Sequence, residues 1–197
     1  MRRVLLPVVC CAASYIAAGC SSEQRDAPRG WYCAGSKLED EDAPGGFGPC
    51  DNFPKRCANG VPGTAGQLSL IAYPGETVER GKRAWMRLRL VNRTQEMAVF
   101  CACDSRLYLV QEALDRRGRW RALERFPETS CGNSFHRVFL GREEYWDLYA
   151  LPRAGSFKTK LRFRLEPRGE AAIAEGGQAV YSSEFEGSIQ PSEFLQD

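Results

Sequence analysis

Strict alternation of apolar and charged side chains is the clearest pattern in this 197-residue chain. It is strongest in "SFKTKLRFRLE", residues 156–166. One set of alternating positions is apolar or Thr, and the other is cationic: Phe157, Thr159, Leu161, Phe163 and Leu165 against Lys158, Lys160, Arg162 and Arg164. Successive side chains of a strand point to opposite faces, so this run predicts a strand with one buried and one solvated face.

Similar short runs recur through residues 67–190 and predict about seven or eight strands. They are "QLSLIAYPGETV", ended by Pro74-Gly75, then "RAWMRLRLV", "RLYLVQEAL", "RWRALERF", "FHRVFL" and "QAVYSSEFEGSI". In "RAWMRLRLV", Arg87 and Arg89 fall on one face and Leu88 and Leu90 on the other. The turn Asp115-Arg116-Arg117-Gly118 predicts a hairpin with Gly at its end. A short helix over residues 105–117 is the alternative on propensity alone.

Such strands at short, turn-punctuated spacing predict an all-β antiparallel sandwich. The phrases "YPGETVERGKRAWMRLRLVNRT", "DRRGRW" and "LPRAGSFKTKLRFRL", taken in order, resemble many bacterial immunoglobulin-like domains. The resemblance covers residues 67–190 and implies an immunoglobulin-like β-sandwich. It implies a fold only, because such folds host many functions.

The amino terminus has a different pattern, with two arginines followed by 15 apolar residues from Val4 to Ala18. This order is typical of a secretory signal peptide, and the run is shorter than the ~20 residues of a membrane-spanning helix. Ala17-Ala18-Gly19 leads directly into Cys20. This resembles the lipobox of bacterial lipoproteins, which implies cleavage before Cys20, a diacylglycerol thioether on its sulfur and often a further acyl chain such as palmitate. An ordinary secretion signal with a nearby disulfide cysteine is the alternative.

These patterns divide the chain into five segments. Residues 1–19 are the expected leader, residues 20–30 the lipidated cysteine and a polar tether, and residues 31–66 a Cys-, Gly- and Pro-rich loop segment. The sandwich is expected over residues 67–190, and residues 191–197 form a carboxyl-terminal tail. Two or more acyl chains hold a protein stably at a membrane. The expected location is therefore the outside of a membrane, and the outer membrane in a cell that has two.

Cysteine usage fits export. Of the nine cysteines, two fall in the expected leader and Cys20 at the lipidation position. Six remain as disulfide candidates: Cys33, Cys50, Cys57, Cys101, Cys103 and Cys131. An even count in an exported chain predicts three disulfides of undetermined pairing, at least one of which would join the amino-terminal group to the sandwich. Metal binding is the alternative, but a single residue between Cys101 and Cys103 does not match the spacing of structural zinc sites.

No catalytic constellation stands out. The one histidine, His136, lies in a predicted strand, so a histidine-based metal triad is impossible and a Ser-His-Asp triad would have to recruit it. Glu143 and Glu144 would point to opposite faces of a strand, unlike the paired acids of a glycosidase. The acidic run at residues 39–42 lacks the spacing and Gly of an EF-hand loop. We therefore expect no cofactor, no metal and no enzymatic activity.

Charge supplies the one functional candidate. Residues 80–168 have a net side-chain charge of +10, between segments of −4 and −6. The candidate surface comprises Lys158, Lys160, Arg162 and Arg164, joined by Arg87 and Arg89. It could attract an anionic glycan, a lipid head group or an acidic envelope protein. The alternative is cross-strand ion pairing, in which exposed pairs are worth ~0–1 kcal/mol.

The sequence thus predicts a membrane-anchored envelope lipoprotein that acts as a binding or accessory module, with the membrane as one partner and no nucleic acid. The alternative is a small exported hydrolase that uses His136.

Overall fold

The computed structural model describes residues 30–38, 47–128, 132–167, 169 and 178–195. These residues are mostly β-strand, with short 3-10 turns at Gly132–Ser134 (η1) and Pro191–Glu193 (η2). Every strand pair among them is antiparallel. The predicted all-β antiparallel fold is confirmed. No helix in the described ranges is long and apolar enough to cross a bilayer.

The first of two large sheets, which we call the β4 sheet, has the order β1 (Gly30–Trp31), β10 (Glu144–Ala150), β4 (Arg83–Asn92) and β3 (Leu68–Arg80). The short strand β2 (Lys55–Arg56) pairs with the start of β10. Along β4 the residues Met86, Leu88 and Leu90 are buried, and Arg87 and Arg89 alternate with them on the outer face. The predicted alternation of β4 is confirmed.

The second sheet, the β11 sheet, has the order β12 (Val180–Tyr181), β11 (Phe157–Leu165), β7 (Leu109–Leu114) and β8 (Trp120–Ala122). Strand β13 (Phe185–Ile189) follows β12 along the same edge of β11. Between the two, the Ser182 hydroxyl accepts the Phe163 N–H at 2.9 Å, and the Ser182 N–H donates to the Phe163 carbonyl at 3.0 Å. This side chain keeps the ladder satisfied where the edge strand is interrupted.

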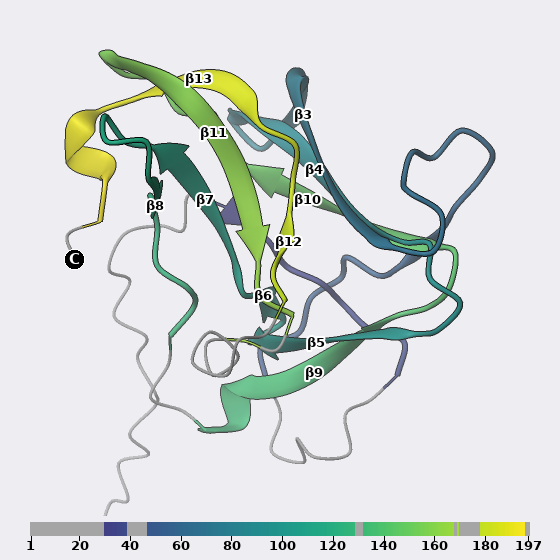
Figure 1. The fold of residues 1–197 in the computed structure, drawn as a ribbon. Helices are drawn as coiled ribbons and strands as arrows, with labels where there is room; N and C mark the ends of the chain where they lie inside the picture. The colour runs from purple at the N-terminus through teal and green to yellow at the C-terminus, as the bar shows by residue number, and fades with distance from the viewer. Residues whose placement is uncertain (1–29, 39–46, 129–131, 168, 170–177, 196–197) are drawn as a thin grey trace, which may run out of the picture.

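A smaller sheet of β6 (Arg106–Leu107), β5 (Ala98–Cys103) and β9 (Phe135–Leu140) lies across one end of the molecule (Figure 1). In the large sheets, β3, β4 and β10 occupy the positions of strands A, B and E of an immunoglobulin domain, and β7, β11 and β13 those of C, F and G. Strand β8 lies beside β7, where variable-type domains add a strand. The topology agrees with the immunoglobulin-like architecture.

The core lies between the two large sheets. Its largest fully buried side chains are Trp146, Phe100 and Phe163, and the first two meet edge to face at 5.7 Å between ring centroids. The Trp146 indole N–H donates to the Gly35 carbonyl at 3.0 Å, so its polar atom is satisfied. A ring of this size contributes about 3–5 kcal/mol relative to Ala. The inward-facing positions of the alternating strands therefore determine the fold.

The sequence prediction was wrong about several strands. Strand β3 does not end at Pro74-Gly75 but continues to Arg80, with a register shift between Tyr73 and Thr77. It is an edge strand, where a proline removes no ladder hydrogen bond. Strands β5 and β10 were missed because "AVFCAC" and "EYWDLYA" lack clean polar alternation. The alternative helix over residues 105–117 is also wrong, because β6 and β7 occupy most of it.

The cysteines follow the prediction in part. Cys33 and Cys50 form a disulfide. This bridge lies within the amino-terminal group, so it does not join that group to the sandwich. Cys57 and Cys103 are free thiols, which corrects their prediction as bridge partners: Cys57 follows β2 on the β4 sheet, whereas Cys103 ends β5 in the smaller sheet. Burial raises the pKa of both thiols. Cys131 lies outside the described residues.

Candidate functional site

The predicted basic stripe lies on the outer face of β11, where its arginines are paired. The Arg162 Nε–H donates to Glu112 Oε2 on β7 at 2.8 Å. Its guanidinium carbon lies 4.2 Å from the ring centroids of both Trp120 and Tyr181. Arg162 and Glu112 are direct register partners, and the Glu112 side chain is only 6% exposed. Arg162 is thus fixed by a buried carboxylate and two aromatic rings.

Arg164 is held in the same way. Its Nε lies 3.0 Å from Glu112 Oε1 as an ion pair, and its Nη1 lies 3.3 Å from Glu166 Oε1. Burial raises the pKa of Glu166, although the charge of Arg164 acts in the opposite direction. Lys160 pairs with exposed Glu184 at 3.0 Å, and Lys158 remains exposed. Most of the stripe is therefore neutralised.

Arg87 and Arg89 do not join that stripe, which corrects the prediction of one continuous surface. They lie on the outer face of the β4 sheet, on the other side of the core. Arg89 Nε donates to Asp147 Oδ1 at 2.8 Å, and Arg87 forms an ion pair with Glu76. Burial by itself would lower the pKa of Arg89, but the hydrogen bond and charge of Asp147 raise it above its usual value.

His136 lies on β9 in a closed environment. Its ring stacks on Phe47 with centroids 3.6 Å apart, and its Nδ1 lies 3.1 Å from the Ser134 carbonyl oxygen. Its Nε2 lies 3.4 Å from Ser105 Oγ, but the Ser105 hydroxyl donates to the Gly48 carbonyl at 2.8 Å. Ser105 is only 1% exposed. This hydroxyl has no path to a substrate. Glu143 has a φ of +57° in the turn before β10, so Glu143 and Glu144 are not consecutive strand residues as predicted.

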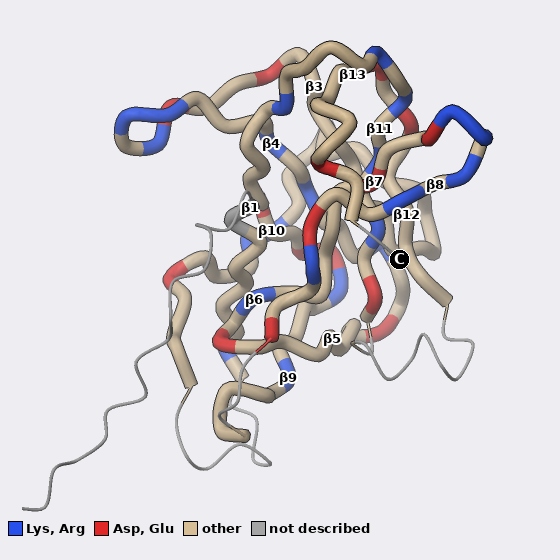
Figure 2. Tube along the Cα trace, turned by 90° about the vertical axis from the view of Figure 1, so that its left-hand side faces the viewer, with Lys and Arg blue, Asp and Glu red and all other residues tan. Residues whose placement is uncertain are grey.

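The hairpin between β7 and β8 forms a different cationic region. Asp115 Oδ1 accepts the backbone N–H groups of Arg117 at 2.8 Å and Arg119 at 2.9 Å, and Gly118 closes the turn with a φ of +73°. The backbone N–H of Arg119, first among several donors, lowers the pKa of Asp115. The predicted hairpin is confirmed. Its turn carries Arg116, Arg117 and Arg119 outward, and cationic residues crowd its tip in Figure 2.

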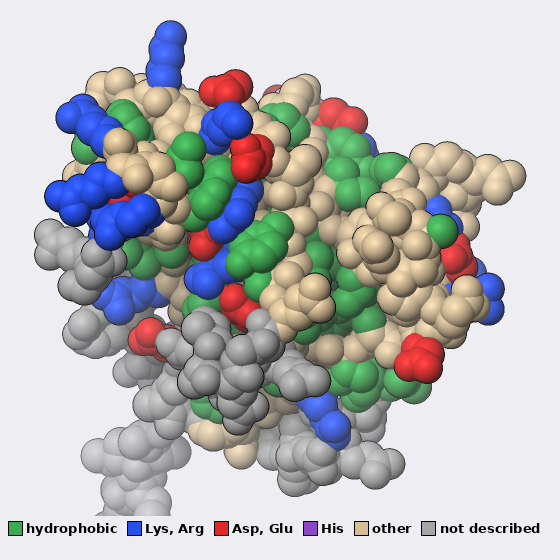
Figure 3. All heavy atoms as spheres, in the orientation of Figure 1, with side chains coloured by type: hydrophobic (Ala, Val, Ile, Leu, Met, Phe, Trp, Pro, Cys, Tyr) green, Lys and Arg blue, Asp and Glu red, His purple; other side chains and the backbone are tan. Residues whose placement is uncertain are grey.

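This hairpin and the carboxyl-terminal segment enclose a groove of about 480 Å³. The groove is lined by Asp115, Arg116, Arg117, Arg119, Arg121, Phe157, Pro191 and Phe194. We call it the arginine groove. Figure 3 shows Lys and Arg side chains gathered at the end of the molecule where these segments lie.

Two aromatic rings form the apolar part of the groove. Phe157, the first residue of β11, and Phe194, which follows η2, meet edge to face at 6.1 Å. The guanidinium of Arg116 lies 5.5 Å from the centroid of Phe157, and that of Arg121 lies 5.6 Å from the centroid of Phe194. Arg121 also donates to the Leu195 carbonyl. The rings thereby hold cationic head groups beside an apolar surface.

Negative charge is scarce in the groove. Asp115 is the one acidic residue of its lining, and its carboxylate already accepts two backbone N–H groups and pairs with Arg119 at 3.2 Å. Arg116 and Arg117 form no ion pair with any described residue. Four guanidinium groups against one carboxylate give the lining a net charge of +3.

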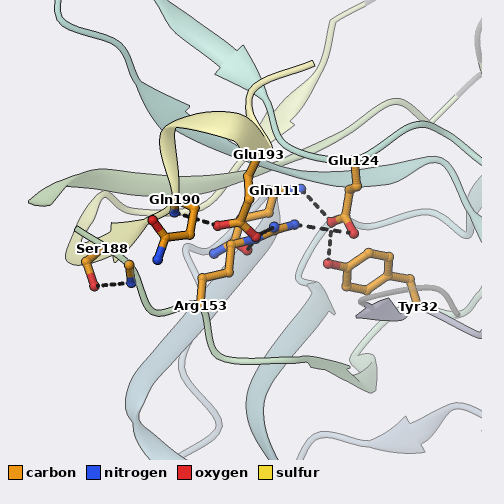
Figure 4. Close-up of polar contacts among 8 residues, drawn as sticks. Tyr32, Gln111, Glu124, Arg153, Ser188, Gln190 and Glu193 are labelled. Carbon is orange, nitrogen blue, oxygen red and sulfur yellow. Dashed lines mark hydrogen bonds and ion pairs between the residues drawn. The ribbon is translucent and has the colours of Figure 1, made fainter. Parts of the chain in front are cut away.

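A buried polar cluster fixes the wall that η2 provides (Figure 4). The Arg153 side chain, 2% exposed, donates to Glu193 Oε1 at 2.8 Å and to Gln111 Oε1 at 2.6 Å. Glu193 Oε2 in turn accepts the Gln190 N–H at 2.8 Å. Arg153 also lies 3.8 Å from Glu124. The wall is thus tied to the sandwich through a single guanidinium.

The same cluster reaches the amino-terminal segment. The Tyr32 hydroxyl donates to Glu124 Oε1 at 2.8 Å. Burial first, and then the charge of Glu124, raises the pKa of Tyr32 well above its ordinary value. The first and last described segments of the chain therefore meet at β7 and the segment after β8.

The sequence analysis missed the arginine groove. It identified the turn at residues 115–118 but assigned no function to its arginines. The available signal was the density of "DRRGRWR", four arginines within seven residues. Phe157 and Phe194 could not be connected to it before the fold was known.

Comparisons with known proteins give no identity. No protein-family model matches the chain, and no curated protein matches it.

Proposed function

We propose that this protein is a lipid-anchored binding module of the cell envelope, and that the arginine groove binds an anionic ligand. The observation that carries the proposal is the charge imbalance of the groove. Arg116 and Arg117 have no carboxylate partner among the described residues, whereas Arg162 and Arg164 share Glu112. Cations gathered without counter-charge in a concave, partly apolar site attract anions more strongly than cations on a flat wet surface.

The size of the groove supports a ligand rather than a large protein interface. Small-molecule sites in proteins usually have volumes of ~300–1,000 Å³, and the groove has about 480 Å³. A head group or a short stretch of anionic glycan is of this size. Its two phenylalanine rings provide the apolar lining common to such sites.

The anchor rests on the lipobox-like segment at Cys20, which lies outside the described residues. A domain held near a bilayer by a short tether meets surface-bound anions at high effective concentration. The alternative, a hydrolase that uses His136, finds less support, because the hydroxyl nearest to His136 among the described residues is buried and bonded to a carbonyl.

Binding of a polyanion tests the groove. We expect the full-length protein, solubilised in detergent, to bind dextran sulfate but not neutral dextran, with affinity that falls as salt rises. The variant Arg116→Gln/Arg117→Gln should bind about tenfold more weakly, because each charged contact is worth roughly 1.4 kcal/mol or more.

The matched control is Lys82→Gln/Arg83→Gln, which removes two cations from the β3–β4 hairpin on the other sheet. It should change the affinity by less than about twofold. Equal losses in the two variants would mean that only overall charge matters and would contradict the proposal.

The anchor has its own test. In the producing cell, Cys20→Ala should move the protein from the membrane fraction to the soluble exported fraction and change its processing. Unchanged membrane association and processing would refute lipidation at Cys20 while leaving the groove hypothesis intact.

A further inference from the structure

Building on the proposed function, we infer that the arginine groove recognises a phosphate monoester on a sugar or polyol ring. The geometry behind this inference is a set of four guanidinium groups around an apolar floor of Phe157 and Phe194. The ligand could be part of an envelope lipid or a soluble metabolite, and the two sources share this chemistry.

Charge magnitude favours phosphate. The lining carries four arginines and one carboxylate. A carboxylate or sulfate ester contributes one negative charge, whereas a phosphate monoester carries about −1.5 to −2 near pH 7 and three strong acceptor oxygens. A phosphate therefore offsets more of the excess and can accept from several guanidinium groups at once.

The choice of cation points the same way. Every cation of the lining is arginine and none is lysine. Guanidinium presents a planar fork of N–H donors that matches phosphate oxygens in pairs, whereas an ammonium acts as a point charge. Arg116 over Phe157 and Arg121 over Phe194 are already oriented by the rings, so less conformational freedom is lost on binding.

The aromatic floor accounts for the ring of the ligand. Inorganic phosphate would leave Phe157, Phe194 and Pro191 uncovered and most of the 480 Å³ unfilled. The C–H face of a sugar ring can lie against such an apolar surface. Asp115 lies in the lining as an acceptor for a ring hydroxyl. The groove thus combines donors for the phosphate with contacts for the ring that bears it.

Calorimetry with matched sugars tests the inference on the full-length protein in detergent. The probes are glucose 6-phosphate, glucose 6-sulfate, glucuronate and inorganic phosphate. We expect glucose 6-phosphate to bind about tenfold more tightly than each of the other three. Sulfate or glucuronate binding as tightly would overturn the phosphate inference and leave the proposed function standing. Equal binding of inorganic phosphate would overturn the role of the ring. If neither these probes nor dextran sulfate bound, both proposals would fail.

Variants separate the fork from the charge. Arg116→Lys/Arg117→Lys keeps both charges, and we expect it to lose about fivefold in affinity for glucose 6-phosphate but little for dextran sulfate. Lys82→Gln/Arg83→Gln is the control that should retain both. Full retention of glucose 6-phosphate binding by the lysine variant would contradict fork recognition.

Vesicles identify the source. Phosphatidylcholine vesicles that contain phosphatidylinositol 4-phosphate present a ring phosphate monoester, whereas those with phosphatidylinositol do not. Co-sedimentation with the first only, reversed by glucose 6-phosphate, supports a lipid source. Binding of glucose 6-phosphate without vesicle binding supports a soluble one. Equal binding to both vesicles would contradict recognition of the monoester.

Discussion

Two groups of arginines lie on the β11 sheet and its hairpin, and they differ in what surrounds them rather than in what they are. Arg162 and Arg164 on β11 share the buried carboxylate of Glu112. Arg116 and Arg117, at the tip of the β7–β8 hairpin, have no acidic partner among the described residues, although Arg116 is stacked on Phe157 much as Arg162 is stacked on Trp120.

Aromatic stacking is therefore common to both groups, and the supply of carboxylate separates them. A guanidinium whose charge is met by a buried carboxylate contributes to the packing of the sheet. A guanidinium in a groove without such a partner retains its capacity for an external anion. Removing a paired arginine or its acid should reduce stability, and removing an unpaired one should reduce binding.

Arg153 is the extreme paired case and gives the largest expected effect. Arg153→Met should lower the free energy of unfolding by about 3–5 kcal/mol, because it leaves Glu193 and Glu124 buried with the guanidinium gone. Urea denaturation measures the loss, and Arg117→Met is the exposed control. A loss below about 1 kcal/mol would mean that the cluster in Figure 4 does not hold the groove wall.

Glu112→Gln should convert the paired group into an unpaired one. We expect a loss of about 1.5–3 kcal/mol in the free energy of unfolding, because Arg162 and Arg164 both lose their shared charge partner. The variant should also gain anion binding on the β11 face. Glu184→Gln, which breaks an exposed pair with Lys160, should cost at most about 1 kcal/mol. Similar losses in the two variants would remove the distinction between buried and exposed pairs.

The hairpin variant gives the opposite signature. Arg116→Gln/Arg117→Gln should shift the free energy of unfolding by no more than about 0.5 kcal/mol, since both side chains are exposed and unpaired. Thermal and urea melts check this, and they also verify that loss of ligand binding is not loss of fold. A destabilisation comparable to that of Glu112→Gln would mean that these arginines are structural.

The smallest effect concerns acid. The pKa of Asp115 is lowered in the folded protein, so its contribution to hairpin stability is present above its ordinary value near ~3.9 and is lost as the pH falls through the lowered folded value. The amide resonances of Arg117 and Arg119 should move together in this acidic window. Asp115→Asn should abolish the shared titration. Its persistence would show that another group controls the turn.

Period-two alternation was sufficient to predict β4 and β11, because their outer faces are charged and their inner faces apolar. It failed for β10, whose outer positions carry Tyr145, Asp147 and Tyr149, so that neither face is plainly polar. The arginines of β11 were identified, but their neutralisation was not, because the register that places Arg162 opposite Glu112 depends on the fold.

The groove was beyond sequence analysis for a similar reason. Its arginines are adjacent in the chain, but Phe157 and Phe194 come from β11 and from the segment after η2. Only the folded chain shows that this turn faces an apolar wall instead of open water.

The most direct test of the difference between the two groups is nitrogen-15 NMR of the arginine side-chain Nε–H groups during titration with glucose 6-phosphate. The account predicts saturable shifts for Arg116, Arg117 and Arg119, with Arg162 and Arg164 unmoved. Shifts of equal size at Arg162 and Arg164, or none at the hairpin, would contradict it.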